Sequence, residues 1–171
     1  YKRQLQLGLS YKATEWLSVF GGGRMNYFTG GYKGFLNAIV KGTDTNLLPL
    51  ALNCDQTGWG LTPVIGADVK LGKLNIGAKY EFKTNLNIEN NTKNLQYPPS
   101  AKDMVAPYEH GVNTPNDIPA MLSIAAAYEF LPVLRASVEY HFYDDKNAGM
   151  ANGKQKYLTK GTNEYLAGIE F

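Results

Sequence analysis

The residues with the most reactive side chains are few and widely spaced along this sequence. Its two histidines, His110 and His141, stand far apart, and Cys54 is the single cysteine. No serine or cysteine has the setting of an activated nucleophile, and neither histidine has a second ligand at a spacing that suits zinc. The segment KGTDTN has too few carboxylates for a calcium loop. We therefore expect no catalytic residue, no metal, no cofactor and no enzyme activity.

Charged residues instead recur on one side of alternating segments. Arg135, Glu139 and His141 share one face if their segment is a strand, and Arg24 has a similar place in an earlier segment. One interpretation is that Arg24, Arg135 and His141 bind the carboxylate headgroup of a ligand. The other, which we favour, is the ion-paired interior common to barrels with a polar lumen. The same interpretation covers Asp68, Lys70, Lys79, Glu81 and Lys83.

An apolar segment, NLLPLALN, interrupts a region that is otherwise polar. Apolar residues in an exposed loop need an explanation. Leu47, Leu48 and Leu50 could form a hydrophobic groove on the outer surface that captures a lipid-like ligand. The same residues could equally form a helical turn that packs over the mouth of a barrel. The sequence leaves both interpretations open.

Alternation of apolar and polar residues predicts the elements that carry these side chains. In LGKLNIGAKYEF, the residues Leu74, Ile76, Ala78, Tyr80 and Phe82 form an apolar row, and the residues between them are mostly polar. This period of two indicates a strand. The pattern recurs and predicts seven strands, at 4–13, 17–28, 59–71, 74–82, 120–130, 134–142 and 164–171. Several are about 10 residues or longer, the length that a tilted strand needs to cross a bilayer core.

Short and long connections alternate between these predicted strands. The links at 14–15, 72–73 and 131–132 are short, whereas those at 30–57, 84–119 and 144–162 are long and polar. Tight turns at one end and long loops at the other are typical of outer-membrane barrels. We therefore expect an all-β, antiparallel, up-and-down transmembrane β-barrel, with residues 1–171 forming part of one domain.

Composition agrees with this fold class and excludes others. The net charge of +2 is too small to indicate binding to nucleic acid. Charged residues make up 19%, below the usual quarter for soluble domains, and no apolar run is long enough for a membrane helix. Aromatic residues cluster near strand ends, where a girdle would lie. A soluble β-sandwich or lipocalin-like barrel is the alternative, but its second face would carry more charge. Small residues occupy that face here: Gly60, Gly66, Gly77, Ala125 and Ala127.

The alternation also predicts which side chains face lipid. We expect the apolar row to point outward, because charge on the lipid face at mid-bilayer costs about 2–4 kcal/mol. The residues expected to face lipid are Ile76, Ala78, Tyr80, Leu122, Ile124 and Val138. Those expected to face the lumen are Lys79, Glu81, Arg135 and Glu139.

Pro63 lies inside a predicted strand and cannot donate a ladder hydrogen bond, so it marks a bulge, an edge or a kink. We favour a bulge that shapes the wall. The other interpretation is a lateral gate.

Three segments resemble the long-chain fatty acid transporters of the FadL/TodX-like outer-membrane family, in particular members of the Bacteroidetes type. They are GLSYKATEWLSVFGGGRMNYFTGGYKG at 8–34, GWGLTPVIGADVKLGKLNIGAKYEFKTNL at 58–86, and VNTPNDIPAMLSIAAAYEFLPVLRASVEYHFYD at 112–144. The resemblance implies a monomeric barrel of 14 strands with an N-terminal hatch, in the outer membrane of a Gram-negative bacterium. It also implies passive uptake of hydrophobic compounds.

The chain departs from that family in length. An odd number of antiparallel strands cannot close an up-and-down barrel, and open edges are not tolerated in lipid. We therefore expect a fragment, with the hatch and further strands outside residues 1–171. Two functions remain open: uptake of hydrophobic small molecules such as long-chain fatty acids, or a barrel that docks as a structural subunit onto a secretion translocon. The expected partners are membrane lipid and a hydrophobic small molecule, or a protein partner in the second case.

Overall fold

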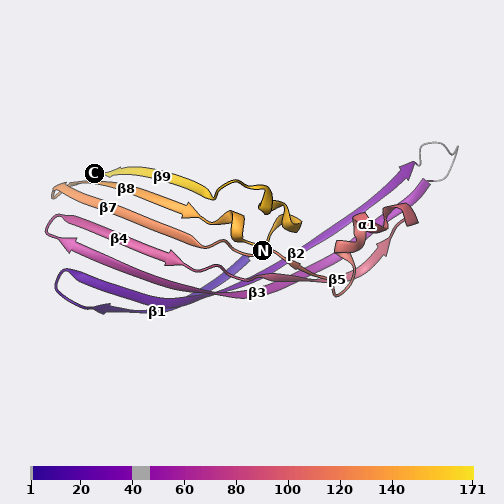
Figure 1. Ribbon diagram of the computed structural model, residues 1–171, viewed down its shortest axis with the longest axis horizontal. Helices are drawn as coiled ribbons and strands as arrows, with labels where there is room; N and C mark the ends of the chain where they lie inside the picture. The colour runs from indigo at the N-terminus through magenta and orange to yellow at the C-terminus, as the bar shows by residue number, and fades with distance from the viewer. Residues whose placement is uncertain (1, 40–46) are drawn as a thin grey trace.

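The fold is a single antiparallel sheet of long strands. The computed structural model describes residues 2–39 and 47–171, and the side chains of these except at 36–39, 47–49 and 151–152. The sheet path contains β1 (Lys2–Lys12), β2 (Leu17–Ile39), β3 (Leu47–Leu71), β4 (Leu74–Glu81), β7 (Met121–Leu131), β8 (Leu134–Tyr143) and β9 (Thr162–Glu170). These strands lie side by side in chain order, and each pair of neighbours is antiparallel (Figure 1).

The tight turns lie together at one end of the sheet. They join β1 to β2, β3 to β4 and β7 to β8, and all three are at the left in Figure 1. Antiparallel pairing along the whole path places the longer connections toward the opposite end. The all-β class, the seven-stranded path and the segregation of turns from long connections are therefore confirmed.

The first long loop was predicted wrongly. Instead of a loop over 30–57, β2 and β3 remain paired from Leu17↔Val69 to Ile39↔Leu47, and only 40–46 lie outside the described residues. The two strands contain 23 and 25 residues. At about 3.3 Å per residue each is roughly 75–80 Å long, far more than a bilayer needs. The segment NLLPLALN therefore belongs largely to a strand, because paired backbone continues through its polar and apolar residues alike.

The second predicted loop, 84–119, contains further structure. Strand β5 (Asn87–Gln96) pairs with the far half of β3, and the short β6 (Asn113–Pro115) pairs with β5. Between them lie η1 (Pro99–Ala101), α1 (Lys102–Val105) and η2 (Ala106–Tyr108). The far halves of β2 and β3, together with β5, β6 and these helical turns, form what we call the extension. The third long connection contains η3 (Asp145–Asn147) and η4 (Ala151–Tyr157).

The helical turns of the extension are held against β5 by hydrogen bonds to backbone carbonyls. Asn90 Nδ2 donates to Pro107 O at 2.7 Å, and Thr92 Oγ1 donates to Tyr108 O at 2.5 Å. The Tyr108 ring meets Tyr32 of β2 edge-on, with centroids 5.6 Å apart. A helical element therefore does pack over the sheet, but it comes from the second connection and not from NLLPLALN.

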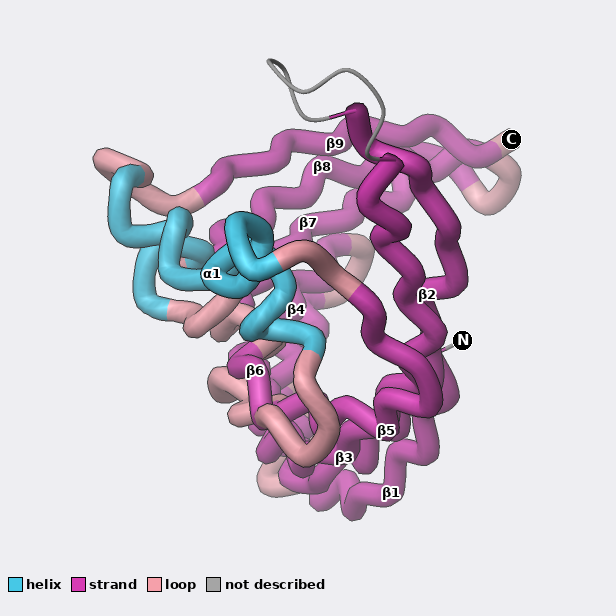
Figure 2. The backbone as a smooth tube through the Cα atoms, turned by 90° about the vertical axis from the view of Figure 1, so that its right-hand side faces the viewer, coloured by secondary structure: helices cyan, strands magenta, loops and turns pink. Residues whose placement is uncertain are grey.

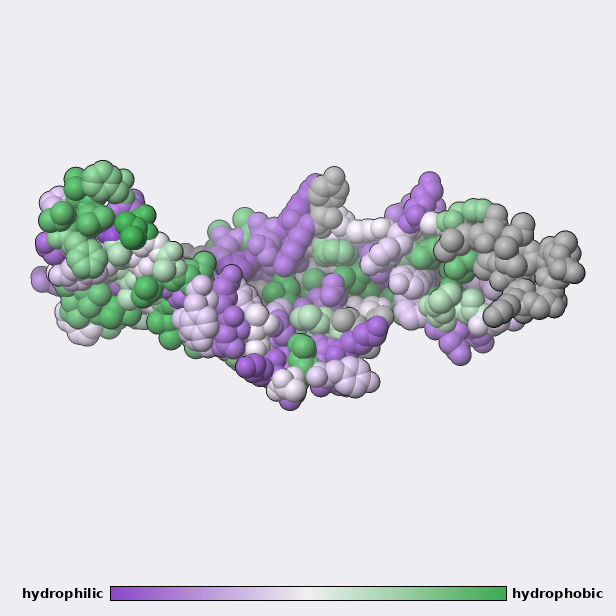
Figure 3. Space-filling view, turned by 90° about the horizontal axis from the view of Figure 1, so that it is seen from above, coloured by the Kyte–Doolittle hydropathy of each residue, from purple (hydrophilic) through white to green (hydrophobic). Residues whose placement is uncertain are grey.

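The sheet curls into an open trough (Figure 2). Its burial pattern is the inverse of that in a water-soluble protein, because polar side chains are buried on the inner face and apolar ones are exposed on the outer face. On the inner face Asn26, Thr62 and Thr84 are 1%, 2% and 0% exposed. On the outer face Leu7 and Leu9 are 72% and 84% exposed. Seen from above, hydrophobic side chains gather over the half of the molecule that holds the tight turns, and hydrophilic ones gather over its middle (Figure 3).

The predicted assignment of residues to the two faces agrees with the sheet. The expected outer residues Ile76, Tyr80, Ile124 and Val138 are exposed on the apolar face. Leu122 and Ala78 share rows with them, through Tyr80↔Leu122 and Ala78↔Ile124. Lys79, Glu81, Arg135 and Glu139 fall on the opposite face. Lys83 departs from this pattern because β4 ends at Glu81 and the alternation stops there.

Two local features explain how β1 to β4 fit together. Gly22 pairs with Gly8, and a Cβ at Gly22 would lie 2.4 Å from Leu7 O, so the two strands approach too closely for a side chain. Pro63 forms no bulge: it pairs with Gly23 in regular register, and the ladder between β3 and β4 ends beside it at Val64↔Glu81. Proline suits this interruption because it has no N–H to donate.

The two outermost strands have unpaired edges within the described sheet. β1 pairs with β2 alone, and β9 pairs with β8 alone. Along the path, β1 and β9 are at opposite ends and do not pair with each other. The described sheet is therefore an open wall with two edges, each of which presents backbone groups that a further strand could pair with.

Candidate functional site

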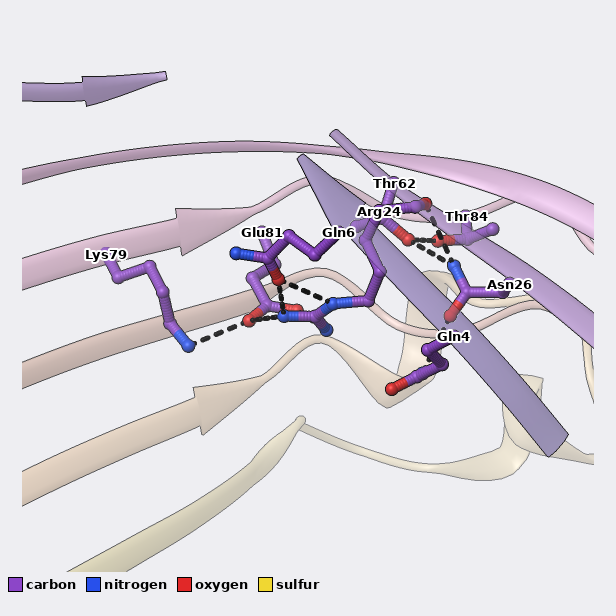
Figure 4. A network of polar contacts seen from close by, with 8 residues as sticks. All are labelled: Gln4, Gln6, Arg24, Asn26, Thr62, Lys79, Glu81 and Thr84. Carbon is purple, nitrogen blue, oxygen red and sulfur yellow. Dashed lines mark hydrogen bonds and ion pairs between the residues drawn. The ribbon is translucent and has the colours of Figure 1, made fainter. Parts of the chain in front are cut away.

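A charged cluster crosses the trough from β2 to β4 (Figure 4). Arg24 Nη1 lies 2.6 Å from Glu81 Oε2, and Arg24 Nη2 donates to Glu81 Oε1 at 2.9 Å. Such a two-pronged pair is the geometry in which guanidinium and carboxylate match best. Lys79 Nζ lies 2.8 Å from Glu81 Oε1, and Gln6 Oε1 accepts from Arg24 Nε at 2.9 Å. The cluster therefore links β1, β2 and β4.

The sheet curvature makes this contact possible. β2 and β4 are not neighbours, because β3 lies between them. Side chains on the inner face of a curled sheet converge, so Arg24 can reach Glu81 across β3. Val64 of β3, which pairs with both Gly22 and Glu81, is fully buried. The ion pair acts as a strut on the inner face and helps to hold the curvature.

A row of neutral polar side chains continues from the strut toward the extension. Gln4 Nε2 donates to Asn26 Oδ1 at 2.7 Å, and Asn26 Nδ2 donates to Thr62 Oγ1 at 2.8 Å. Thr62 Oγ1 in turn meets Thr84 Oγ1. Buried polar groups without hydrogen-bond partners are costly. This network, in which each side chain has a partner, therefore stabilises the part of the trough next to the extension.

A second charged cluster lies on the opposite wall, on β8 and β9. His141 Nδ1 lies 3.1 Å from Glu164 Oε2, and His141 Nε2 lies 3.5 Å from Glu139 Oε2. Tyr143 Oη also donates to Glu164 Oε2 at 3.1 Å. The imidazole is thus placed between two carboxylates.

Between the two clusters the inner face is hollowed, with a volume of about 610 Å³. Its lining combines apolar and small residues such as Phe20, Gly66 and Met121 with polar ones, which include Ser123, Lys79, His141, Asp68 and Glu139. Within the described chain, Ser123 Oγ is buried without a hydrogen-bond partner. The Lys79 side chain is 43% exposed, and its ammonium pairs with Glu81. Apolar surface and charged side chains therefore share this hollow.

The predicted binding residues do not form one site. Arg24 lies on β2 and His141 on β8, on opposite walls of the trough. Arg135 pairs with Glu170 near the tight turns, six positions and roughly 20 Å along β8 from His141. Each of these three residues faces a carboxylate, which favours the ion-paired interior over a shared headgroup site.

The apolar residues of the extension are also separate from the hollow. Leu50 is half-buried on β3 and pairs with Leu36. Leu47 and Leu48 belong to the same strand, and their side chains lie outside the described ones. Their suggested part in ligand capture stays a prediction.

Reasoning from the sequence missed the residues that frame the hollow. Phe20, Met121 and Ser123 come from segments distant in sequence and meet only through the strand register. Phe20 was the clearest signal, because it is a large aromatic residue on the polar side of its strand. Its ring lies where a Cβ at Gly8 would be, 2.4 Å away.

Neither a metal-binding cluster nor a membrane-spanning helix is found in the described residues. No cluster of three or more His, Cys, Asp or Glu among them could hold a metal ion. No helix of the described chain combines the length and apolar character that crossing a membrane requires. Comparisons with protein-family models, with curated proteins and with solved structures found no match.

Proposed function

We propose that the chain forms part of the wall of an outer-membrane β-barrel in a Gram-negative bacterium, and that this barrel takes up hydrophobic small molecules such as long-chain fatty acids. The observation that carries the proposal is the inverted burial: amide and hydroxyl side chains are buried inside, and leucines are exposed outside. In water this distribution is unfavourable, since each buried methylene is worth about 0.8 kcal/mol. In a bilayer it is the favourable one.

Strand lengths support the membrane placement. β1, β7, β8 and β9 contain 11, 11, 10 and 9 residues, which matches the 9–11 residues or so that a tilted strand needs to cross the hydrocarbon core. In a barrel, further strands would pair with the open edges of β1 and β9. The expected total of 14 strands rests on the family resemblance alone.

The hollow supports passage of an amphipathic or apolar molecule. Phe20 and Met121 offer apolar contact, and the partly exposed side chain of Lys79 lines the same hollow. An apolar chain gains affinity from buried methylenes without any charged partner. The segment resemblance to long-chain fatty acid transporters points to the same class of molecule.

The membrane placement can be tested by labelling neighbouring positions. With Cys54 replaced by Ala, a spin label would be attached at Ile124→Cys or at Ala125→Cys in vesicles. We expect the label at 124 to respond to the lipid-soluble relaxant oxygen, and the label at 125 to respond to a water-soluble nickel chelate. Equal access of the nickel chelate to both positions would contradict the placement.

Transport needs a separate measurement. Vesicles that contain the complete protein should take up a fluorescent long-chain fatty acid faster than protein-free vesicles. The variant with Leu47, Leu48 and Leu50 all changed to Ser should then show weaker uptake if the apolar segment captures ligand. Unchanged uptake would remove that segment from the mechanism.

A second function is favoured by the extension. β2 and β3 run on well past the length that spans a bilayer, and β5, β6 and helical turns give this part its own packed structure. Such a projection could dock onto a secretion translocon. No uptake by the intact protein, together with a stable partner chain that is lost when residues 97–112 are deleted, would favour this docking function.

A further inference from the structure

A groove lies on the outer face of the sheet, next to the extension. Its volume is about 710 Å³, within the range of roughly 300–1,000 Å³ that small-molecule sites occupy. Aromatic and apolar side chains form one part of its lining, and amide side chains form another. The residues that define this boundary groove are Tyr27, Trp59, Leu61, Asn85, Asn87 and Asn113.

Strand register explains how the aromatic part of the groove arises. Tyr27 of β2 pairs with Trp59 of β3, which in turn pairs with Asn87 of β5. Paired residues project from the same face of a sheet, so the two rings and the amide stand in one row across three strands. Trp59 and Tyr27 are 66% and 40% exposed. The groove therefore offers an aromatic surface that a ligand can cover, with an amide at its end.

A polar row runs beside the aromatic one. Thr57 of β3 pairs with Glu89 of β5, and Glu89 pairs with Asn113 of β6. The side chains of Asn87, Glu89 and Asn113 are exposed, and among the described residues they form no hydrogen bond or ion pair. An amide offers both donors and an acceptor, and a carboxylate offers acceptors. A ligand in the groove therefore meets hydrogen-bonding groups of both kinds.

The charge of the lining does not favour an ion of either sign. The lining contains one cation, Lys83, and one carboxylate, Glu89. The Lys83 ammonium already donates to Asn147 O at 3.5 Å and lies 3.7 Å from Asp117 Oδ2. An acyl chain fits poorly as well, because it would cover the amides without satisfying them. A neutral ligand with many hydrogen-bonding groups matches the groove best.

We propose that the boundary groove binds a neutral saccharide, with one sugar ring stacked on Trp59 and its hydroxyls hydrogen-bonded to Asn87 and Glu89. A pyranose has a face of C–H groups, which packs on an aromatic ring, and a rim of hydroxyls that donate and accept hydrogen bonds. The site lies on the outer face, separate from the hollow, and depends on neither uptake nor the membrane placement. The sugar can be part of a free oligosaccharide or of a neutral glycolipid headgroup, and separate ligands distinguish these sources.

Trp59 itself reports on this binding in the complete protein. Replacing Trp16 and any further tryptophan by Phe leaves Trp59 as the sole indole. The protein would be held in lauryldimethylamine oxide, a detergent without sugar, and titrated separately with maltohexaose, cellohexaose and mannohexaose. Nanodiscs that contain galactosylceramide would test the glycolipid source. We expect a saturable change in Trp59 emission with at least one of these four ligands. No change with any of them, or a change with a fatty acid alone, overturns the saccharide site.

Matched variants locate the site by calorimetric titration with the saccharide that binds. Trp59→Leu should weaken binding by about tenfold or more, whereas Trp16→Leu, which also removes an exposed indole, should leave it unchanged. Asn87→Ala should weaken binding by about threefold or more. Asn91→Ala, on the same face of β5 but outside the lining, should not. The two groove residues lie on different strands, so either variant decides if the other does not fold. Unchanged binding in the folded groove variants overturns the site.

Discussion

At the scale of single residues, the strut between Arg24 and Glu81 joins strands that are not neighbours. Glu81 is buried, and its carboxylate receives both Arg24 and Lys79. Removing Arg24 would leave a buried carboxylate with one partner fewer, whereas Lys79 is more exposed and easier to replace by water. The two cations should therefore contribute unequally to stability.

We predict that Arg24→Gln lowers the free energy of unfolding by about 1.5–3 kcal/mol, the usual range for a lost hydrogen bond to a charged group. Lys79→Gln is the matched control and should cost about 0–1 kcal/mol, as for an exposed ion pair. Urea unfolding in lipid vesicles, followed by tryptophan fluorescence, measures both. Equal losses in the two variants would show that the Arg24–Glu81 pair contributes no more to the free energy of unfolding than the Lys79–Glu81 pair does.

At the scale of elements, the contact between β1 and β2 depends on a pair of glycines. Gly22 has Leu7 O where a Cβ would be, but a Cβ at the adjacent Gly21 would have no atom within 4 Å. We predict that Gly22→Ala costs about 1–3 kcal/mol through overpacking, and that Gly21→Ala stays within about 0.5 kcal/mol. The same urea titration compares them, and similar values for both would contradict the close approach of the strands.

The two faces of β7 offer a second test at this scale. Ile124 is exposed on the outer face, and the next residue, Ala125, lines the hollow. Ile124→Lys should cost about 2–4 kcal/mol in a bilayer, because it places a charge on the lipid face. Ala125→Lys should change stability by about 0.5 kcal/mol or less, since its ammonium can extend into water. A larger loss for Ala125→Lys would reverse the assignment of the faces.

At the scale of the whole molecule, the open edges of β1 and β9 must be covered if the sheet lies in a membrane. We predict that the complete protein closes into a barrel that resists detergent at room temperature. An unheated sample should then migrate differently from a boiled one on a denaturing gel. If the unheated sample migrates at the same position as the boiled one, the result counts against a closed barrel.

The local pattern of the sequence was enough to predict the seven strands of the sheet path and their faces, though not the extension. In the stretch that contains Ile76 and Lys79, side chains alternate strictly, so the strand and its two faces follow from backbone geometry alone. Short links such as the one at Gly72 similarly set antiparallel neighbours, because few residues can reverse the chain only between adjacent strands. These features depend on residues that are close together in the chain.

Long-range pairing decided the rest. The composition of residues 30–57 is mostly polar, as is typical of a loop. Two strands that pair with each other nevertheless satisfy their backbone hydrogen bonds whatever their side chains are. Arg24 and Glu81 meet across β3 only because the sheet curls, and Phe20, Lys79 and Met121 surround one hollow only because of the register. Alternation along a strand carries no information on register or curvature, so these contacts belong to the tertiary structure alone.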